Sequence, residues 1–324
     1  MRTIVPSVRT LVLISLFFSS SFKSFAQSIT SGDGKYELGI GIGPLFFLGD
    51  LGGAPGTGKT FVKDVDFPLT KISKGLYLNV YPTEWFGFRI AANHGMLEGN
   101  DAQTNTKGGA EEYRKARNLK FKSSMTEVFA GVEFYPTVFF EQYDGLQGKL
   151  RPYGMLGLGM FHFNPKGEYS ANGTTQWVAL QPLRLEGQGM GEYPNRKQYS
   201  LTQMHMPMAI GAKYYLKENM YIGLEILHRM TFTDYVDDVS TTYIDNNLFQ
   251  KYLTPEQTAM ANQLYYRSNQ VNGITRPPYT DEQRGDPTEN DAFFSSLIRC
   301  GWRLNDRNSP GGRATRQMRC PSFY

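Results

Sequence analysis

One stretch of the chain has the residue types and spacing of a nucleotide-binding loop. The run GAPGTGKT begins at Gly53 and ends at Thr60, and it fits the pattern G-x-x-x-x-G-K-[ST] in full. In that pattern backbone N–H groups cradle phosphate, while Lys59 and Thr60 would reach phosphate and magnesium. The chemistry needs a buried strand before the loop and a helix after it. A glycine-rich amphipathic segment precedes the run and Pro68 follows it without a helical period, so we expect a plain loop and no bound nucleotide.

A second set of candidate ligands consists of four acidic residues in one segment, Asp234, Asp237, Asp238 and Asp245. Carboxylate oxygens are the ligands that calcium prefers. The set lacks the regular spacing and the glycine of an EF-hand loop, and a solvated loop with Asx turns is the simpler interpretation. Whether the segment from Asp234 to Asp245 binds calcium stays open at this point.

The histidines and cysteines are too scattered to indicate a metal site. The four histidines lie on four different candidate strands without H-x-x-x-H spacing: His94, His162, His205 and His228. Three of them, all except His205, share the apolar face near strand ends, where a membrane interface would suit them. No serine has the sequence context of a nucleophile elbow. The sequence therefore predicts no catalytic residue, no cofactor and no metal.

Cys300 and Cys320 are the two cysteines of the chain, and two cysteines make no disulfide framework. Cys300 belongs to the apolar face of a candidate strand, which makes a bond to Cys320 awkward. The redox state of both residues stays open.

The beginning of the chain has the features of a secretory signal. Arg2 and Arg9 precede a short apolar run at residues 11–18, and a small-residue cleavage pattern ends at Ala26. We expect a signal peptide at residues 1–26, a barrel at 27–304 and a basic periplasmic tail at 305–324. The formal net charge of +4 is small and the basic residues are scattered, so nucleic acid is not an expected partner.

The elements that must position any site are eight segments in which apolar and polar residues alternate. They centre on residues 38–42, 76–80, 86–90, 128–134, 156–160, 206–210, 222–226 and 294–302. Because strand side chains alternate between two faces, each segment has one apolar face. The opposite faces carry charges of both signs: Glu37, Arg89, Glu127, Glu133, Lys213, Glu225, Arg229, Arg299 and Arg303. A secreted β-sandwich or a soluble barrel would bury the apolar face, whereas a membrane barrel would turn it to lipid and pair the charges inside.

The lengths of the connections favour the membrane barrel. Residues 82–84 and 216–219 are tight turns and 137–148 is a moderate one, but the links at 50–73, 97–122, 165–199 and 231–291 are long. Short periplasmic turns and long extracellular loops are typical of outer-membrane barrels. We therefore predict an all-β fold, an eight-stranded antiparallel transmembrane barrel in the cell outer membrane with a charged, closed lumen. Aromatic residues near strand ends would mark the two interfaces: Tyr81, Trp85, Tyr135, Phe161, Phe163, Tyr214, Tyr215, Tyr221 and Trp302.

Two further segments have local signals. Thr254, Pro255 and Gln257 form a capping-box pattern before a short apolar helix face, which would cover the barrel mouth or meet a partner. The tail at 305–324 carries four arginines, and it would be either a disordered end or a docking segment.

Five stretches resemble the PorG-type outer-membrane barrels of the type IX secretion system of gliding and protease-secreting Bacteroidetes. They are residues 36–53 (YELGIGIGPLFFLGDLGG), 118–136 (NLKFKSSMTEVFAGVEFYP), 151–169 (RPYGMLGLGMFHFNPKGEY), 180–189 (LQPLRLEGQG) and 232–243 (FTDYVDDVSTTY). The last stretch is the most specific. The resemblance implies a non-enzymatic component of the secretion and gliding motility machinery, with outer-membrane lipid and the periplasmic ring proteins PorK and PorN as partners. The moderate turn at 137–148 and the basic tail are the candidate ring contacts.

Two other functions fit the same barrel. One is a stand-alone OmpA/OmpX-like protein for adhesion or envelope stability. The other is a transport barrel for lipids or small solutes, which the predicted closed lumen argues against.

Overall fold

The computed structural model describes residues 36–51, 69–104, 111–140, 146–271 and 278–304. The predicted signal peptide at 1–26, the loop from Gly53 to Thr60, Cys320 and the basic tail at 305–324 lie outside the described residues.

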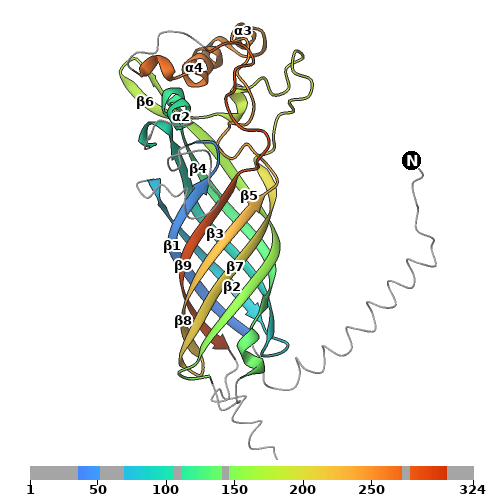
Figure 1. Cartoon of the computed structure of the whole chain (residues 1–324). Helices are drawn as coiled ribbons and strands as arrows, with labels where there is room; N and C mark the ends of the chain where they lie inside the picture. The colour runs from blue at the N-terminus through green and yellow to red at the C-terminus, as the bar shows by residue number, and fades with distance from the viewer. Residues whose placement is uncertain (1–35, 52–68, 105–110, 141–145, 272–277, 305–324) are drawn as a thin grey trace, which may run out of the picture.

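Eight antiparallel strands close into a tall barrel (Figure 1). Their bounds are β1 (Tyr36–Leu48), β2 (Lys71–Val80), β3 (Phe86–Asn100), β4 (Lys120–Phe134), β5 (Leu150–Ala171), β7 (Thr202–Lys217), β8 (Met220–Thr231) and β9 (Ala292–Leu304). Neighbours along the chain pair with each other, β1 pairs with β9, and the β4–β5 pairing is part of the same closed ring. Closure leaves none of these eight strands as an open edge, which lipid would not tolerate. The predicted fold class is confirmed.

The alternation of side chains is inverted relative to a water-soluble barrel. In β8, Leu224 is 65% exposed whereas the next residue, Glu225, is 3% exposed. The same parity holds around the ring, with Ile40, Leu76, Ile90, Leu158 and Ile298 all exposed on the outer wall. A continuous apolar wall of this extent would be unfavourable in water and is the surface that lipid requires. Every barrel strand has at least 10 residues, enough for the roughly 9–11 that a bilayer crossing needs.

The two ends of the barrel differ in size. At one end are the short turn at residues 81–85, the two-residue turn at 218–219 and the link at 135–149, which contains the 3₁₀ turn η4 (Pro136–Phe139). At the other end the links are long, as predicted, and by the rule for such barrels this end faces the cell exterior.

The strand β5 continues past the barrel and forms a hairpin with β6 (Thr174–Ala179), which the sequence analysis placed within a loop. Asn172 and Gly173 join the two strands with φ values of 52° and 75°. Left-handed values at both turn residues are typical of a type I′ hairpin turn, for which Asn-Gly is the preferred pair.

The long links pack together above the barrel as a cap, which we define as the described residues within 101–119, 168–201 and 232–291 (Figure 1). The cap contains α2 (Glu111–Arg117), α3 (Asn247–Tyr252) and α4 (Pro255–Tyr265), with the 3₁₀ turns η3 (Asp101–Gln103), η5 (Gln181–Leu183) and η6 (Ser268–Gln270). Its buried apolar residues belong to one cluster that continues into the upper lumen. The links are thus a packed structure rather than separate solvated loops.

The predicted capping box of α4 is confirmed. The Thr254 side chain accepts a hydrogen bond from the Gln257 backbone, and the Gln257 side chain accepts one from the Thr254 backbone. Ala261, Leu264 and Tyr265 are buried in the cap. Within the described residues, none of the helices is long and apolar enough to cross a bilayer.

The predicted aromatic interfaces are partly wrong. Trp85, Tyr214 and Trp302 are exposed on the outer wall, as expected. The other six residues of that prediction point into the lumen and are nearly inaccessible: Tyr81, Tyr135, Phe161, Phe163, Tyr215 and Tyr221. The reason is strand parity, because these six residues alternate with the lipid-facing positions instead of sharing them.

Candidate functional site

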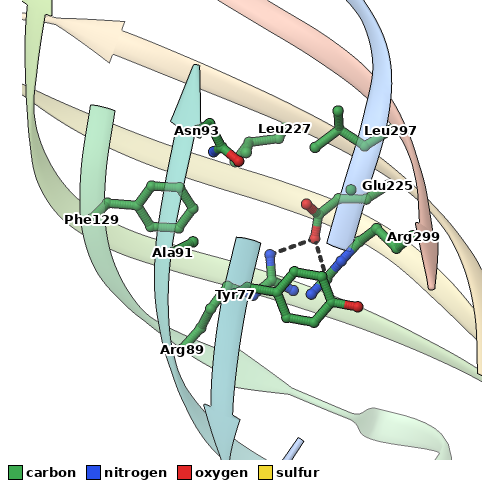
Figure 2. Close-up of a pocket in the computed structure, with 10 residues that line it drawn as sticks. Tyr77, Arg89, Ala91, Asn93, Phe129, Glu225, Leu227, Leu297 and Arg299 are labelled. Atoms are coloured by element: carbon green, nitrogen blue, oxygen red, sulfur yellow. Dashed lines mark hydrogen bonds and ion pairs between the residues drawn. The ribbon is translucent and has the colours of Figure 1, made fainter. Parts of the chain in front are cut away.

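The middle of the lumen is filled by a network of paired charges. We call Glu37, Arg89, Glu127, Glu133, Lys213, Glu225, Arg229 and Arg299 the lumen network; all eight are buried. The Glu225 carboxylate accepts hydrogen bonds from Arg89 at 2.6 Å and Arg299 at 2.7 Å. Tyr153 donates a third bond to the same carboxylate at 2.6 Å. Figure 2 shows Glu225 between the two guanidinium groups.

The rest of the lumen network follows the same pattern of opposite partners. Lys213 binds Glu37 at 2.6 Å, and Arg89 binds Glu133 at 2.5 Å. Higher in the barrel, Arg229 binds Glu127 at 2.5 Å. With four carboxylates and four cations the network is formally neutral, which is the condition under which buried charges are tolerated. The predicted charged lumen is confirmed.

An apolar layer lies above the charges and was not predicted. Leu45, Leu97, Phe121, Phe163 and Phe293 are each at most 2% exposed and belong to the cluster that continues into the cap. Below this layer, a cavity beside Arg89, Phe129 and Glu225 leaves about 10 Å³ for the centre of a water molecule, which is room for about one water. The lumen side chains named here are nearly inaccessible to solvent.

Tyrosines and a small ion-pair group close the periplasmic end. Tyr81 and Tyr135 contact each other with ring centroids 5.8 Å apart. Glu84, in the turn between β2 and β3, binds Arg151 at 2.8 Å and Arg303 at 3.4 Å. These contacts hold the turn and two strand ends in one arrangement.

The moderate turn predicted as a partner contact exposes two aromatic side chains at this end. Phe139 is 61% exposed and lies against Trp85, with a centroid distance of 5.9 Å. Phe140 is 90% exposed. The Glu218 carboxylate accepts hydrogen bonds from the backbone of Leu146 and Gln147 at 3.0 Å, which ties the turn to the β7–β8 connection.

In the cap, one buried carboxylate joins two of the stretches that carry the family resemblance. Glu186, from residues 180–189, accepts bonds from the backbone of Ser240 at 3.0 Å and of Thr241 at 2.9 Å. The Thr241 hydroxyl and Arg284 each donate a further bond at 2.8 Å. We call this group the cap lock. The sequence analysis missed Glu186 because its partners lie 54 or more positions away along the chain.

The backbone around the cap lock adopts left-handed conformations. Arg184 has φ +50° and Asp238 φ +67°, values that non-glycine residues seldom adopt. Tyr199 donates to the Asp238 carboxylate at 2.6 Å, and Arg284 donates to the Asp238 carbonyl at 2.8 Å. The hydrogen bonds of the cap lock and its neighbours therefore hold the backbone at Arg184 and Asp238 in conformations that would otherwise be unfavourable.

The acidic segment is divided between separate environments. Asp237 accepts bonds from the backbone of Leu51 at 3.1 Å and of Val239 at 2.9 Å. Asp245 is exposed and accepts from the Asn247 backbone at 3.0 Å. Within the described part of the chain, no group of three or more His, Cys, Asp or Glu side chains is arranged to hold a metal ion.

Four carboxyl groups gather where the cap meets the barrel, and we call Asp50, Asp234, Asp237 and Asp291 the acid cluster. Burial, followed by repulsion from the other members, raises the pKa of Asp237 and of Asp291 well above the usual range. Burial raises the pKa of Asp234 to about 8 and that of Asp50 to about 6. The ionised form of one member repels the ionised forms of the others, so the protonation of one member affects the pKa of its neighbours.

The other residues singled out in the sequence do not converge on one site. His94 and His162 are exposed on the outer wall, where they face Thr126 at 2.8 Å and Thr202 at 3.1 Å. His205 is buried in the lumen, 3.5 Å from Glu127. Cys300 lies half-buried on the outer wall with a free thiol.

The sequence matches no protein-family model and no curated protein sequence. Solved structures that share the outline of the fold include OprG from Pseudomonas aeruginosa (TM-score 0.36, 11% identity, 84% of this chain and 98% of that chain). A major outer membrane protein from Thermus thermophilus has TM-score 0.37 and 9% identity over 84% of this chain and 99% of that chain. Neisserial surface protein A has TM-score 0.35 and 7% identity over 85% of this chain and 98% of that chain.

The assignment of the fold itself rests on the strand pairings and the exposed apolar wall. Closed antiparallel barrels of this kind, apolar outside and polar inside, span outer membranes. The chain is an eight-stranded outer-membrane β-barrel whose described lumen is filled by paired charges and whose outer end carries a packed cap.

Proposed function

We propose that this barrel is a non-enzymatic component of a type IX protein secretion machinery and contacts the periplasmic ring proteins PorK and PorN. The observation that carries the proposal is the filled lumen, because a barrel without a passage must act through its two ends. The resemblance of five stretches to the PorG-type barrels supplies the identity of the machinery. Nothing in the proposed role requires nucleotide binding by the loop from Gly53 to Thr60.

The periplasmic turn supports the choice of contact surface. Phe140 is 90% exposed, and the Glu218 bonds hold the turn that bears it against the next connection. Aromatic side chains held on a fixed support are typical centres of protein interfaces. The basic tail at 305–324 is a second candidate contact at the same end of the barrel.

The experiment is co-purification of PorK and PorN with the full-length chain from cells. We expect Phe140→Asp to weaken the contact by about 2 kcal/mol, roughly 30-fold, since a central aromatic anchor becomes a charge. Tyr113→Asp is the matched control, because Tyr113 is 82% exposed in α2 at the opposite end. Removal of residues 305–324 tests the tail separately.

Secretion in a deletion strain tests the function independently of the contact surface. We expect loss of cargo secretion and gliding, restored by the wild-type chain. Intact secretion in the deletion strain contradicts the proposed function. Equal recovery of PorK and PorN with Phe140→Asp and with the truncated chain contradicts the proposed surface alone.

The cap favours a second candidate, a stand-alone barrel for adhesion or envelope stability. A cap whose apolar core is continuous with the upper lumen, and whose cap lock is buried, presents a fixed surface to the cell exterior. Under this alternative, deletion leaves secretion intact and reduces binding of cells to surfaces or their resistance to detergents.

A further inference from the structure

We propose that the outer wall of β4, β5 and β6 holds the phosphate group of a phosphorylated glycolipid in the outer leaflet. The surface consists of Lys120 and Lys122 on β4, Lys166 and Glu168 on β5, and Trp177 on β6, which we call the wall patch. Pairing places Lys122 opposite Lys166 and Glu168 opposite Trp177, with all five residues on the outward face. The inference concerns lipid and is independent of the proposed secretion role.

The wall patch has an uncompensated positive charge. Glu168 is bound to Lys120 at 3.3 Å, and Glu98, which opposes Lys122 from β3, is bound to Lys71 at 2.8 Å. Among the described residues, Lys122 and Lys166 have no carboxylate within 4.0 Å. Directly opposed like charges repel each other, and a phosphate between them would turn this repulsion into two charge-assisted bonds.

Trp177 fixes the direction of the two lysines of β4. The Lys122 ammonium lies 3.9 Å from the centre of the indole ring, and the Lys120 ammonium lies 5.2 Å from it. These cation–π contacts turn Lys122 toward β5 and β6, away from Glu98. Amphipathic aromatic rings beside cations are typical of the membrane–water boundary.

The height of the wall patch matches the headgroup region. Below it, outward residues change from apolar Val128 and Met160 to polar Thr126, His162, Ser124 and Asn164. Lys122 is 12 positions from Phe134 (134 − 122) at the periplasmic end of β4. At ~3.4 Å per residue and a tilt of ~40°, this separation is about 31 Å along the barrel axis. Since the apolar band of such barrels is about 25 Å tall, the two lysines lie about 6 Å above it, among the headgroups.

The test is native mass spectrometry of the full-length protein from detergent micelles that contain lipid A with two phosphates as the probe. We expect the wild-type protein to retain lipid A, and Lys122→Gln combined with Lys166→Gln to lower retention about tenfold or more, since both free cations are lost. The Arg pair at the same positions should retain it. Lys197→Gln with Lys251→Gln is the matched control, because it removes two lysines from the cap on the same side of the membrane.

Different gel migration of boiled and unboiled samples establishes that each variant is folded. Equal retention of lipid A stripped of its phosphates, or equal loss in the Lys197/Lys251 control, overturns the proposal. Binding of inorganic phosphate as tight as that of lipid A would show that the patch is a free-phosphate site, and it overturns the lipid assignment.

Discussion

At the scale of single residues, the protein depends on oppositely charged partners for its buried charges. Glu225 receives three bonds, from Arg89, Arg299 and Tyr153, while its neighbour Leu224 faces lipid. A buried ion pair stabilises little by itself, but loss of one member leaves an uncompensated charge. Substitution effects should therefore depend more on which face a residue occupies than on its position along the strand.

The first prediction follows from this contrast. Glu225→Ala should lower the free energy of unfolding by about 3–5 kcal/mol, because two buried guanidinium groups lose a shared partner. Leu224→Ala is the control, and it should have a much smaller effect. The measurement is the urea dependence of the shift in gel mobility of unboiled samples. Equal effects of the two substitutions would contradict the inward orientation of Glu225.

The second prediction concerns pH and the acid cluster. Asp50, Asp234, Asp237 and Asp291 have folded-state pKa values above those of an unfolded chain. The folded cap therefore binds more protons, and its stability should be greatest at low pH and fall as pH rises from about 4 through about 8. The measurement is amide hydrogen exchange at residues 233–240, corrected for the intrinsic pH dependence of exchange.

Asp291→Asn should flatten this pH dependence, because a neutral amide replaces a carboxyl that would otherwise ionise beside three others. Asp245→Asn should leave it unchanged, since Asp245 is exposed on another part of the cap. Protection that rises with pH would contradict the assignment. Calcium that restores protection at pH 8 would answer the question left open by the sequence.

At the scale of elements, the long connections behave as packed structure. The stretches at 180–189 and 232–243 meet at Glu186, whose carboxylate satisfies two backbone N–H groups, a hydroxyl and Arg284. The hairpin of β5 and β6 is equally specific, because its Asn-Gly turn selects a two-residue connection. That Asn-Gly pair was available in the sequence as a hairpin signal, whereas the partners of Glu186 were not.

The third prediction tests the cap lock. Glu186→Ala should remove the carboxylate partner of the buried Arg284 and leave two backbone N–H groups without a buried acceptor, and it should weaken the cap by about 3 kcal/mol or more. Limited proteolysis should then cut within 232–291 while the barrel stays intact. Glu192→Ala is the control, because the Glu192–Lys251 pair is exposed on the surface. Unchanged protease resistance of Glu186→Ala would contradict the role of the cap lock.

At the scale of the whole molecule, two kinds of side chain fill the lumen. Balanced charges fill the middle, and apolar side chains of the barrel and cap fill the upper part. An eight-stranded barrel is just wide enough for side chains to fill. The same closure that removes open strand edges therefore also leaves no solute channel within the described residues.

The fourth prediction is that the folded protein conducts no steady ionic current in a planar bilayer. The charges in the lumen are paired with each other and apolar side chains fill the upper part, so the barrel should carry no current under conditions in which a general porin conducts. Control samples are the porin and the boiled protein. Steady ohmic current through the folded barrel would contradict the closed lumen and favour the transport alternative.

The sequence alone determined the barrel and the orientation of its side chains. The alternation of apolar and polar residues can be read within each of the eight segments, without knowledge of which strands pair. It located the ionic residues of the lumen and the capping box of α4 for the same local reason. Only the tertiary structure decided that Arg229 binds Glu127, 102 positions away, and that Glu225 joins β3 to β9. Those pairings depend on the stagger and tilt of the closed ring, which place residues of distant strands at one height. The packing of the cap could not be predicted from the sequence either, because the partners of a buried carboxylate such as Glu186 come close to it only when the links fold together.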